Sequence, residues 1–385
     1  MSSENNYLFA QKNRLNFECT DNVLFLQGPV GSFFSRFSKS IEKKVNSITH
    51  VNFCTGDKLF NFTKVSIDYK DHISNWPEYL SDIISEKKIT KVYLMNDCRP
   101  YHLLAIKLLK KLNIMFWVFE DGYFRPNLLT LEAFGVNGNS FFQHSKEIPD
   151  LVNKDHLEIK DPILNMTTER VIYSILSLLD IFLFSEYKPY RRIDPLSKFK
   201  EIIFSNLIRI KKKFRTNLFK LNKKNIILAL LQVDDDTQIK FHSLFDSNLE
   251  FIQLLTEVIA SKNSSYHIIF KAHPLDLISA YKYEKILNEK DFRNFDFCFD
   301  DDLDFYLDNA DKVICINSTA GIKALLKNKK VFCCGNSVYS KIRLNDINEI
   351  RSYLSEFIDG KYSIENFHCL EDLKKVTQLN ATFYK

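Results

Sequence analysis

The stretch Ile-Met-Phe-Trp-Val-Phe-Glu-Asp-Gly-Tyr-Phe-Arg-Pro, residues 114–126, decides the fold. Its first six residues, Ile114 to Phe119, are almost wholly apolar, which is typical of a strand buried on both faces in a parallel sheet. The run ends on Glu120 and Asp121, and open α/β sheets place their chemistry at the carboxyl ends of such strands. We therefore expect an α/β protein with reactive groups at these two carboxylates. An acidic surface turn is the alternative interpretation.

A long loop with little helical pattern is expected after this strand, running through Arg125 and Glu132 to Gly138. Such loops in compact domains tend to be functional. Neighbouring side chains of an extended chain point to opposite sides, so only one of the two carboxylates can face a substrate. We expect this to be Asp121, beside the turn, with Glu120 buried or bracing the loop through Arg125.

Length and composition predict two soluble domains. The chain has 385 residues, 45% hydrophobic and 26% charged, and a net charge of +5 that is too small to indicate nucleic acid. The N-terminus lacks the pattern of a signal peptide. No apolar run reaches the length of a membrane span, and the nearest candidate, Val171 to Phe184, is expected to be a buried helix.

The eight cysteines contain no Cys-x-x-Cys pair. Four of them lie in or beside apolar, strand-like runs and are expected to be small buried residues: Cys54, Cys98, Cys315 and Cys333. This usage indicates a reducing cytoplasm.

The first half of the chain alternates strands and helices after a polar N-terminal arm. A strand at 22–27 runs into a turn containing Gly28 and Gly31 and then a helix from about residue 32. A strand at 91–95 is followed by Arg99 and a helix at 101–112. This order predicts a parallel, doubly wound sheet, although the glycine spacing is not that of a dinucleotide-binding turn.

The middle of the chain is strongly basic. Residues 198–224 hold ten Lys or Arg among apolar residues at helical spacing, and the cluster is densest at Lys211, Lys212, Lys213 and Arg215. This composition is typical of a helix lying on an anionic membrane. An interdomain helix pair with a solvated basic face explains the pattern equally well.

The second half predicts another α/β unit, with strands at 225–231, 267–271 and 312–316. Three residues that follow the second and third of these strands are candidates for binding an anion: His273, Ser318 and Thr319. A helix is expected to begin at once after the second and third strands, and helix N-termini suit phosphate groups. A His-Pro turn and a Ser-Thr helix cap are the plain alternatives. The acidic triplets 234–236 and 300–302 could suggest a metal, but the second fits a helix start better, and no metal is expected.

These patterns predict two Rossmann-like domains facing one cleft. The expected ranges are 1–190 for a catalytic and acceptor domain, 191–224 for the basic segment, 225–340 for a donor-binding domain, and 341–385 for helices that pack back on the first domain.

The ordered set of these motifs resembles that of bacterial sialyltransferases and Kdo transferases, and most closely the capsule polysaccharide biosynthesis proteins that are β-Kdo transferases. The resemblance covers about residues 22–340 and is carried by six segments: 26–34, Asn96 to His102, Glu120 to Pro126 with 130–132, 231–233, Lys271 to Asp276, and Ile316 to Gly321. It implies a GT-B glycosyltransferase that moves Kdo from CMP-Kdo to a phosphatidylglycerol-type lipid and starts the linker of a capsule polysaccharide.

The resemblance also implies roles for single residues. Asp121 would be the nucleophile of a retaining mechanism, and Arg125 would pair with the Kdo carboxylate. The donor phosphate would be held by His273, Ser318 and Thr319, with Pro274, Lys271 and Gln232 nearby. Acceptor or loop contacts would come from Gly28, Gly31, Arg99 and Glu132.

The implied setting is peripheral, on the cytoplasmic face of the bacterial inner membrane. The implied partners are the membrane surface, a two-module Kdo transferase and the capsule export machinery, with no cofactor and no nucleic acid. Two other functions fit the same patterns: a non-catalytic scaffold of capsule assembly, and a phosphotransferase that uses a CDP-linked polyol.

Overall fold

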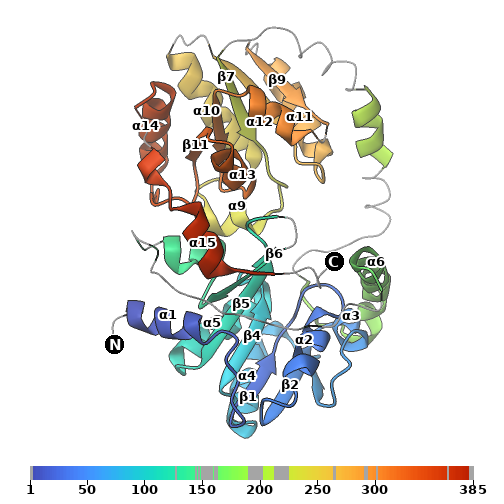
Figure 1. Ribbon diagram of the computed structural model, residues 1–385. Helices are drawn as coiled ribbons and strands as arrows, with labels where there is room; N and C mark the ends of the chain where they lie inside the picture. Colours follow the sequence, from blue (N-terminus) through green and yellow to red (C-terminus); the bar gives the residue numbers. More distant parts are fainter. Residues whose placement is uncertain are drawn as a thin grey trace. The chain divides into compact units, whose positions relative to one another are not determined.

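The computed structural model describes residues 3–125, 128–143, 145, 148, 159, 164–189, 203–211, 225–262, 266–289, 294–300, 302–361 and 364–380. The chain divides into two α/β units (Figure 1). Unit 1 comprises Met1–Phe141, Pro149–Pro195 and Glu371–Lys385, and unit 2 comprises Phe142–Ile148 and Leu196–Leu370. The α/β class is confirmed.

Unit 1 is built on a seven-stranded sheet with the order β12-β6-β5-β4-β1-β2-β3. The neighbours from β5 to β3 are parallel, whereas β6 is antiparallel to both β5 and β12. The strands are β1 (Asn22–Phe25), β2 (Ser47–Asn52), β3 (Ser66–Asp68), β4 (Lys91–Met95), β5 (Met115–Asp121), β6 (Leu128–Ala133) and β12 (Gln378–Asn380). The helices are α1 (Ser3–Lys12), α2 (Phe33–Ile41), α3 (Thr55–Leu59), α4 (Trp76–Glu86), α5 (Pro100–Lys111), α6 (Met166–Leu176), α7 (Asp180–Leu183) and α15 (Leu370–Thr377).

Alternation along the central strands buries both faces of this sheet. On one face Leu24, Val92 and Val118 share a core with side chains of α4 and α5. On the other face the Phe25 ring lies 5.4 Å from the ring of Phe37 on α2. The helix expected from about residue 32 is confirmed as α2, and its residues Phe33, Phe34, Phe37 and Ile41 are all buried.

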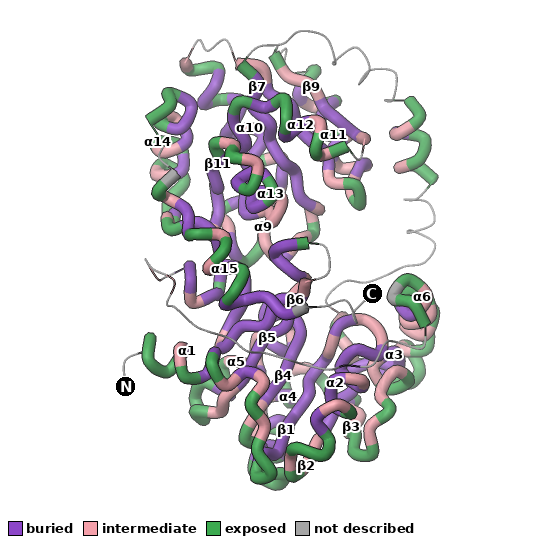
Figure 2. The backbone as a smooth tube through the Cα atoms, viewed as in Figure 1, coloured by how far each residue is buried: buried purple, intermediate pink, exposed green. Residues whose placement is uncertain are grey.

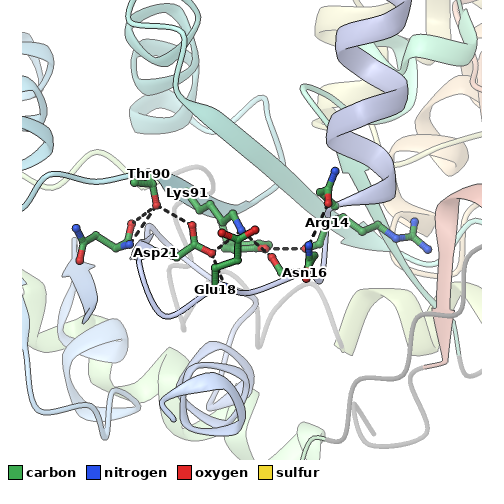
Figure 3. Close-up of polar contacts among 9 residues, drawn as sticks. Arg14, Asn16, Glu18, Asp21, Thr90 and Lys91 are labelled. Carbon is green, nitrogen blue, oxygen red and sulfur yellow. Dashed lines mark hydrogen bonds and ion pairs between the residues drawn. The ribbon is translucent and has the colours of Figure 1, made fainter. Parts of the chain in front are cut away.

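The N-terminal residues belong to the fold, so the expected polar arm was wrong. Helix α1 leads to Arg14, which is buried and donates to the carbonyl oxygens of Leu131 and Val376 at 2.9 and 2.5 Å. A second anchor is Lys91, whose Nζ lies 2.6 Å from Asp21 and 2.7 Å from the Asn16 carbonyl oxygen (Figure 3). Both cations pair with oxygen atoms of segments that are distant in the sequence and so help to hold those segments together.

The expected long loop after β5 was also wrong in part. Strand β6 turns back along β5 immediately, with Glu120 opposite Thr130 and Asp121 opposite Leu129. The sequence gives little to distinguish this short strand from a loop, because turn-forming residues lie on both sides of it.

Unit 2 contains a five-stranded, wholly parallel sheet with the order β11-β10-β7-β8-β9. The strands are β7 (Ile226–Leu230), β8 (His267–Lys271), β9 (Phe295–Cys298), β10 (Lys312–Cys315) and β11 (Lys330–Cys333). The helices are α9 (Thr237–His242), α10 (Asn248–Ser261), α11 (Leu277–Glu289), α12 (Leu303–Asn309), α13 (Ala320–Leu326) and α14 (Ile347–Ile358). Residues 203–211 are also helical.

The C-terminal region is shared between the units, which differs from the expected return of residues 341–385 to the first domain. Helix α14 belongs to unit 2, where Ile350, Leu354 and Phe357 join the core of the five-stranded sheet. Only α15 and β12 join unit 1, where β12 extends the sheet beside β6.

The helix expected to be buried at 171–184 is instead largely exposed. It consists of α6, a 3-10 turn η4 (Ser177–Leu179) and α7, and Figure 2 shows most of α6 as exposed or intermediate. Within the described residues, no helix is both long enough and apolar enough to cross a membrane.

Candidate functional site

Glu120 lies at the end of β5 in unit 1, where two asparagines hold its carboxyl group. Oε2 accepts hydrogen bonds from Nδ2 of Asn96 at 2.9 Å and from Nδ2 of Asn137 at 3.2 Å. Oε1 accepts from the backbone N–H of Asp121 at 3.0 Å. Residues from β4, β5 and the segment after β6 therefore meet at one carboxyl group.

Both asparagines have an unusual backbone conformation. Asn96 has a φ of 63° and Asn137 a φ of 55°, in the left-handed region that asparagine tolerates better than most residues. This backbone turns each side chain toward Glu120, and the two residues were not predicted as site residues. The available signal was an asparagine directly after a buried strand.

Burial raises the pKa of Glu120 to about 8, and the neighbouring carboxylates of Asp121 and Asp97 act in the same direction. The nearby Arg99 opposes the shift. Glu120 is therefore protonated at neutral pH, and its side chain is turned toward the protein.

Asp121 has the opposite environment. Its side chain is 44% exposed, and its Oδ2 lies 3.6 Å from Nη2 of Arg125, whose side chain is 64% exposed. The expectation that Glu120 braces the loop through Arg125 was wrong, because Arg125 faces Asp121 instead. An ion pair this exposed contributes little to stability and is easily exchanged for another partner.

Glu132, expected in a loop, is a fully buried residue of β6. Its carboxyl group accepts from the hydroxyls of Tyr123 at 2.8 Å and Ser140 at 2.5 Å. Burial raises its pKa to about 7. Asp97, also buried, accepts from the N–H of Val136 and from Asn139. Glu132 and Asp97 therefore shape the segment that carries Asn137.

The turn after β1 is constrained on both sides. Gly31 has a φ of +112°, and a Cβ placed there would lie 2.2 Å from Oε2 of Glu169. A Cβ at Gly28 would lie 2.8 Å from the Phe34 ring. Arg99 donates from Nη1 to the Gly28 carbonyl oxygen at 2.8 Å, which ties this turn to the end of β4.

In unit 2, Gln232 connects the ends of β7 and β10. Its Oε1 accepts from the backbone N–H of Asn317 at 3.2 Å, and its own N–H donates to Oδ1 of Asn248 at 3.1 Å. Asn248 also donates to Asp234, which accepts from the Tyr283 hydroxyl. Asn248 and Tyr283 were not predicted, because neither lies in a strand-end motif.

Ser318 and Thr319 lie at the predicted strand-to-helix junction, directly before α13. The Ala320 N–H donates to Oγ of Ser318 at 3.2 Å. The Ser318 carbonyl oxygen accepts from the Tyr339 hydroxyl at 2.7 Å, which fixes the junction from the protein side. Both side chains are partly exposed.

The expected helix start at Pro274 was wrong, because α11 begins only at Leu277. His273 and Pro274 lie on a turn instead, and Nδ1 of His273 accepts from the N–H of Leu275 at 3.2 Å. Lys271 is buried, and its Nζ donates to the carbonyl oxygens of Ala272 and Asp300. In this structure Lys271 therefore donates hydrogen bonds to the backbone of unit 2.

Both acidic triplets have structural partners. Asp236 accepts from the N–H of Gln238 and Asp302 from that of Phe305, so each caps a helix. The helix-start interpretation of residues 300–302 is confirmed.

Of the basic cluster, only Lys211 lies among the described residues, and it is exposed. Its Nζ lies 3.4 Å from the Tyr281 hydroxyl. The predictions for Lys212, Lys213 and Arg215 lie outside the described residues. The four cysteines expected to be buried are buried.

Comparison with known proteins places this arrangement in a family. Residues 90–384 match the family described as capsule polysaccharide biosynthesis protein. The chain belongs to this family. The matched range contains the carboxyl pair of β5 and the strand ends of unit 2 described above, whereas the Gly28–Gly31 turn lies before it.

Relatives of this capsule polysaccharide biosynthesis protein match over nearly their whole length. The capsule polysaccharide modification protein LipB of Neisseria meningitidis serogroup A is 26% identical over 97% of this chain and 94% of its own. The capsule polysaccharide export protein KpsS of Escherichia coli is 26% identical over 94% of this chain and 96% of its own. Among solved structures, the β-Kdo 2,7 transferase of Thermosulfurimonas dismutans KpsC aligns over 87% of this chain and 89% of its own, with 17% identity and a TM-score of 0.41.

Proposed function

We propose that this protein is a glycosyltransferase that moves Kdo from CMP-Kdo to a phosphatidylglycerol-type or lysophosphatidylglycerol-type lipid, with retention of the anomeric configuration. Membership of the capsule polysaccharide biosynthesis family supports the pathway. The observation that carries the proposal is the pair of adjacent carboxyl groups at the end of β5. Asp121 has a side chain that is 44% exposed beside an arginine, and Glu120 is partly buried with a raised pKa.

Asp121 is the proposed nucleophile. Its carboxylate oxygen attacks the anomeric carbon of Kdo, and the bond from that carbon to the phosphate oxygen breaks, leaving CMP with the electron pair. The hydroxyl of the lipid acceptor then attacks the same carbon, and the bond from that carbon to Asp121 breaks with its electron pair returning to the carboxylate. The hydroxyl proton passes to water. Two inversions at one carbon give net retention.

Arg125 and Glu120 assist this nucleophile in different ways. Arg125 is sufficiently exposed to leave Asp121 and pair with the Kdo carboxylate, a geometry that suits a guanidinium. Glu120 is protonated at neutral pH, so Asp121 meets the anionic sugar without a second negative charge beside it. For the same reason Glu120 does not serve as the base for the acceptor hydroxyl.

The donor phosphate is assigned to unit 2. Ser318 and Thr319 offer partly exposed hydroxyls at the end of β10, and His273 lies after β8, the other neighbour of β7. Gln232 contributes by fixing the N–H of Asn317 beside these hydroxyls. The proposal assigns no metal, so we expect a chelator to leave turnover unchanged.

The decisive experiment is intact-protein and peptide mass spectrometry after incubation with CMP-Kdo alone. We expect one Kdo added to a peptide containing Asp121, and we expect Asp121→Ala to abolish both adduct and transfer while CMP still binds. If Glu120→Ala abolishes transfer and Asp121→Ala does not, the two roles are exchanged. If neither substitution matters, the carboxyl pair is not catalytic.

Donor profiling tests the other two functions. Turnover of CDP-glycerol without turnover of CMP-Kdo would replace the proposal with a polyol phosphotransferase. CMP release that depends on the lipid acceptor would eliminate the non-catalytic scaffold. The proposed location is the cytoplasmic face of the inner membrane, beside a two-module Kdo transferase and the capsule export machinery.

A further inference from the structure

The segment from α6 to α7 in unit 1 exposes an unusual number of large apolar side chains. The exposed fractions rise to 60% for Ile175, 73% for Ile181 and 82% for Phe182. We call this surface the α6–α7 face, and its members are Val171, Ile175, Leu178, Leu179, Ile181, Phe182 and Leu183. Exposed apolar patches of this kind mark interaction surfaces.

Two carboxylates of the same segment are turned toward unit 1. Glu169 is buried, with its two carboxylate oxygens accepting from the N–H and the hydroxyl of Ser32, at 2.9 and 2.6 Å, at the start of α2. Asp180 accepts from the N–H of Thr55, at 2.7 Å, at the start of α3. The two carboxylates that could interrupt the apolar surface are thus used to cap helices of the unit beneath it.

The segment is fixed firmly to unit 1. The Tyr173 hydroxyl donates to Oδ1 of Asp57 at 2.6 Å, and Nε2 of Gln27 donates to Oδ2 of the same carboxyl group at 2.9 Å. A Cβ at Gly56 would lie 2.5 Å from the Tyr173 ring, so only glycine permits this close packing. The segment therefore uses hydrogen-bonded polar groups to attach to unit 1, while the seven apolar side chains of the α6–α7 face remain exposed, which departs from the usual amphipathic arrangement.

The charges bordering this face indicate what covers it. Arg170 and Lys188 are exposed, and Lys70 is exposed with its Nζ 5.4 Å from the centre of the Phe184 ring. The exposed carboxylates near this border are Glu186 and Asp71, which is next to Lys70 in the sequence. An apolar surface bordered mainly by cations complements the interface of a bilayer that contains anionic phospholipids.

We infer that the α6–α7 face is a membrane-contact surface that inserts Ile181 and Phe182 into the interface of an anionic phospholipid bilayer. The inference adds an apolar contact to the proposed function, and it rests on that function for the choice of phosphatidylglycerol as the lipid. It is separate from the basic segment, which contains Lys211, Lys212, Lys213 and Arg215 and for which membrane contact was one of two interpretations.

The test uses the full-length protein and needs no donor, so it is independent of catalysis. Trp76 and Trp117 are both fully buried and provide a constant background. In Phe182→Trp, we expect phosphatidylglycerol vesicles to shift the new emission to the blue and brominated acyl chains to quench it. Phe9→Trp is the matched control, because Phe9 of α1 is also exposed, at 56%.

The double variant Ile181→Ser/Phe182→Ser should bind phosphatidylglycerol vesicles about tenfold more weakly than the parent, since each exposed side chain contributes to the buried apolar area. Phe9→Ser should bind as the parent does, and both variants should keep the parent's thermal transition. Two results would overturn the inference: brominated chains that leave the added emission of Phe182→Trp unquenched, or equal vesicle binding by the double variant. A shift from a dimer to a monomer in the double variant would assign the face to a second copy of this chain instead. Vesicle binding with no Kdo transfer would refute the proposed function and leave the membrane contact in place.

Discussion

Replacing Glu120 with glutamine should change how the stability of unit 1 depends on pH. An ordinary glutamate in the unfolded chain loses its proton near pH 4.5, whereas in the folded protein Glu120 keeps it until about pH 8. A raised pKa of this kind gives stability that is complete below pH 4.5 and is lost as the pH rises toward 8. Between these values the unfolded state binds one proton fewer than the folded state at this residue.

The size of the effect follows from that single proton. The free energy of unfolding should fall by about 1.4 kcal/mol for each pH unit because of Glu120. Glu120→Gln removes this contribution and keeps an amide that can occupy the same position. The stability of the variant relative to the parent should therefore increase by about 3 kcal/mol from pH 5.5 to pH 7.5.

Denaturant unfolding followed by tryptophan fluorescence measures this stability difference in unit 1, which contains Glu120, because Trp76 and Trp117 both lie in the core of that unit. Glu86→Gln on α4 is the control for removing an exposed carboxylate. A stability difference between Glu120→Gln and the parent that stays constant over this pH range would refute the argument, because Glu120 would then titrate normally in the folded protein.

Three further predictions concern other parts of the chain. Gly31→Ala should lower the free energy of unfolding by about 2 to 3 kcal/mol, because it adds left-handed backbone strain and displaces Glu169 from its cap. Gly360→Ala is the control, because Gly360 has a φ of +83° and nothing lies within 4 Å of its Cβ. The loss of stability in Gly360→Ala should therefore come from backbone strain alone. His273→Ala should lower kcat/KM by an amount that corresponds to about 2 to 4 kcal/mol of lost transition-state stabilisation. His273→Asn keeps an acceptor for the Leu275 N–H and should lose as much activity. Full activity in His273→Asn would show that the histidine only shapes the turn. Replacing Lys211, Lys212, Lys213 and Arg215 by Gln should weaken vesicle binding at low salt by about 1 kcal/mol per charge, and equal binding by variant and parent at low salt would make this cluster an ordinary solvated surface.

The parallel sheets could be predicted because their strands are buried on both faces and so are apolar throughout. The strand at 91–95 and the one at 267–271 have the predicted bounds. The antiparallel edge could not be predicted in the same way. Strand β12 pairs with β6 across about 250 residues of sequence, and short edge strands take their stability from that distant partner rather than from a local pattern.

The carboxyl pair was predicted from its place at a strand end, but its division of roles depends on residues elsewhere. Whether Glu120 turns inward is decided by Asn96 and Asn137, which approach from other segments in a backbone conformation that no periodicity reveals. The same limit applies to Glu132, whose sequence neighbours suggest a loop. Its partners Tyr123 and Ser140 lie on either side of β6 and enclose it only once the strand has paired.

The segment at 171–184 shows why an apolar helical pattern does not determine which side is buried. Its hydrophobic residues predict a buried helix for a protein that is surrounded only by water. The structure instead turns Glu169, Asp180 and the Tyr173 hydroxyl inward. Their partners are the start of α2, the start of α3 and the carboxyl group of Asp57, in that order. Satisfying buried polar groups matters as much as covering apolar ones, since each buried group left without a partner costs about 1 to 3 kcal/mol. An apolar surface turned outward by such contacts is stabilised when an apolar medium covers it, and the medium that we propose for the α6–α7 face is an anionic bilayer.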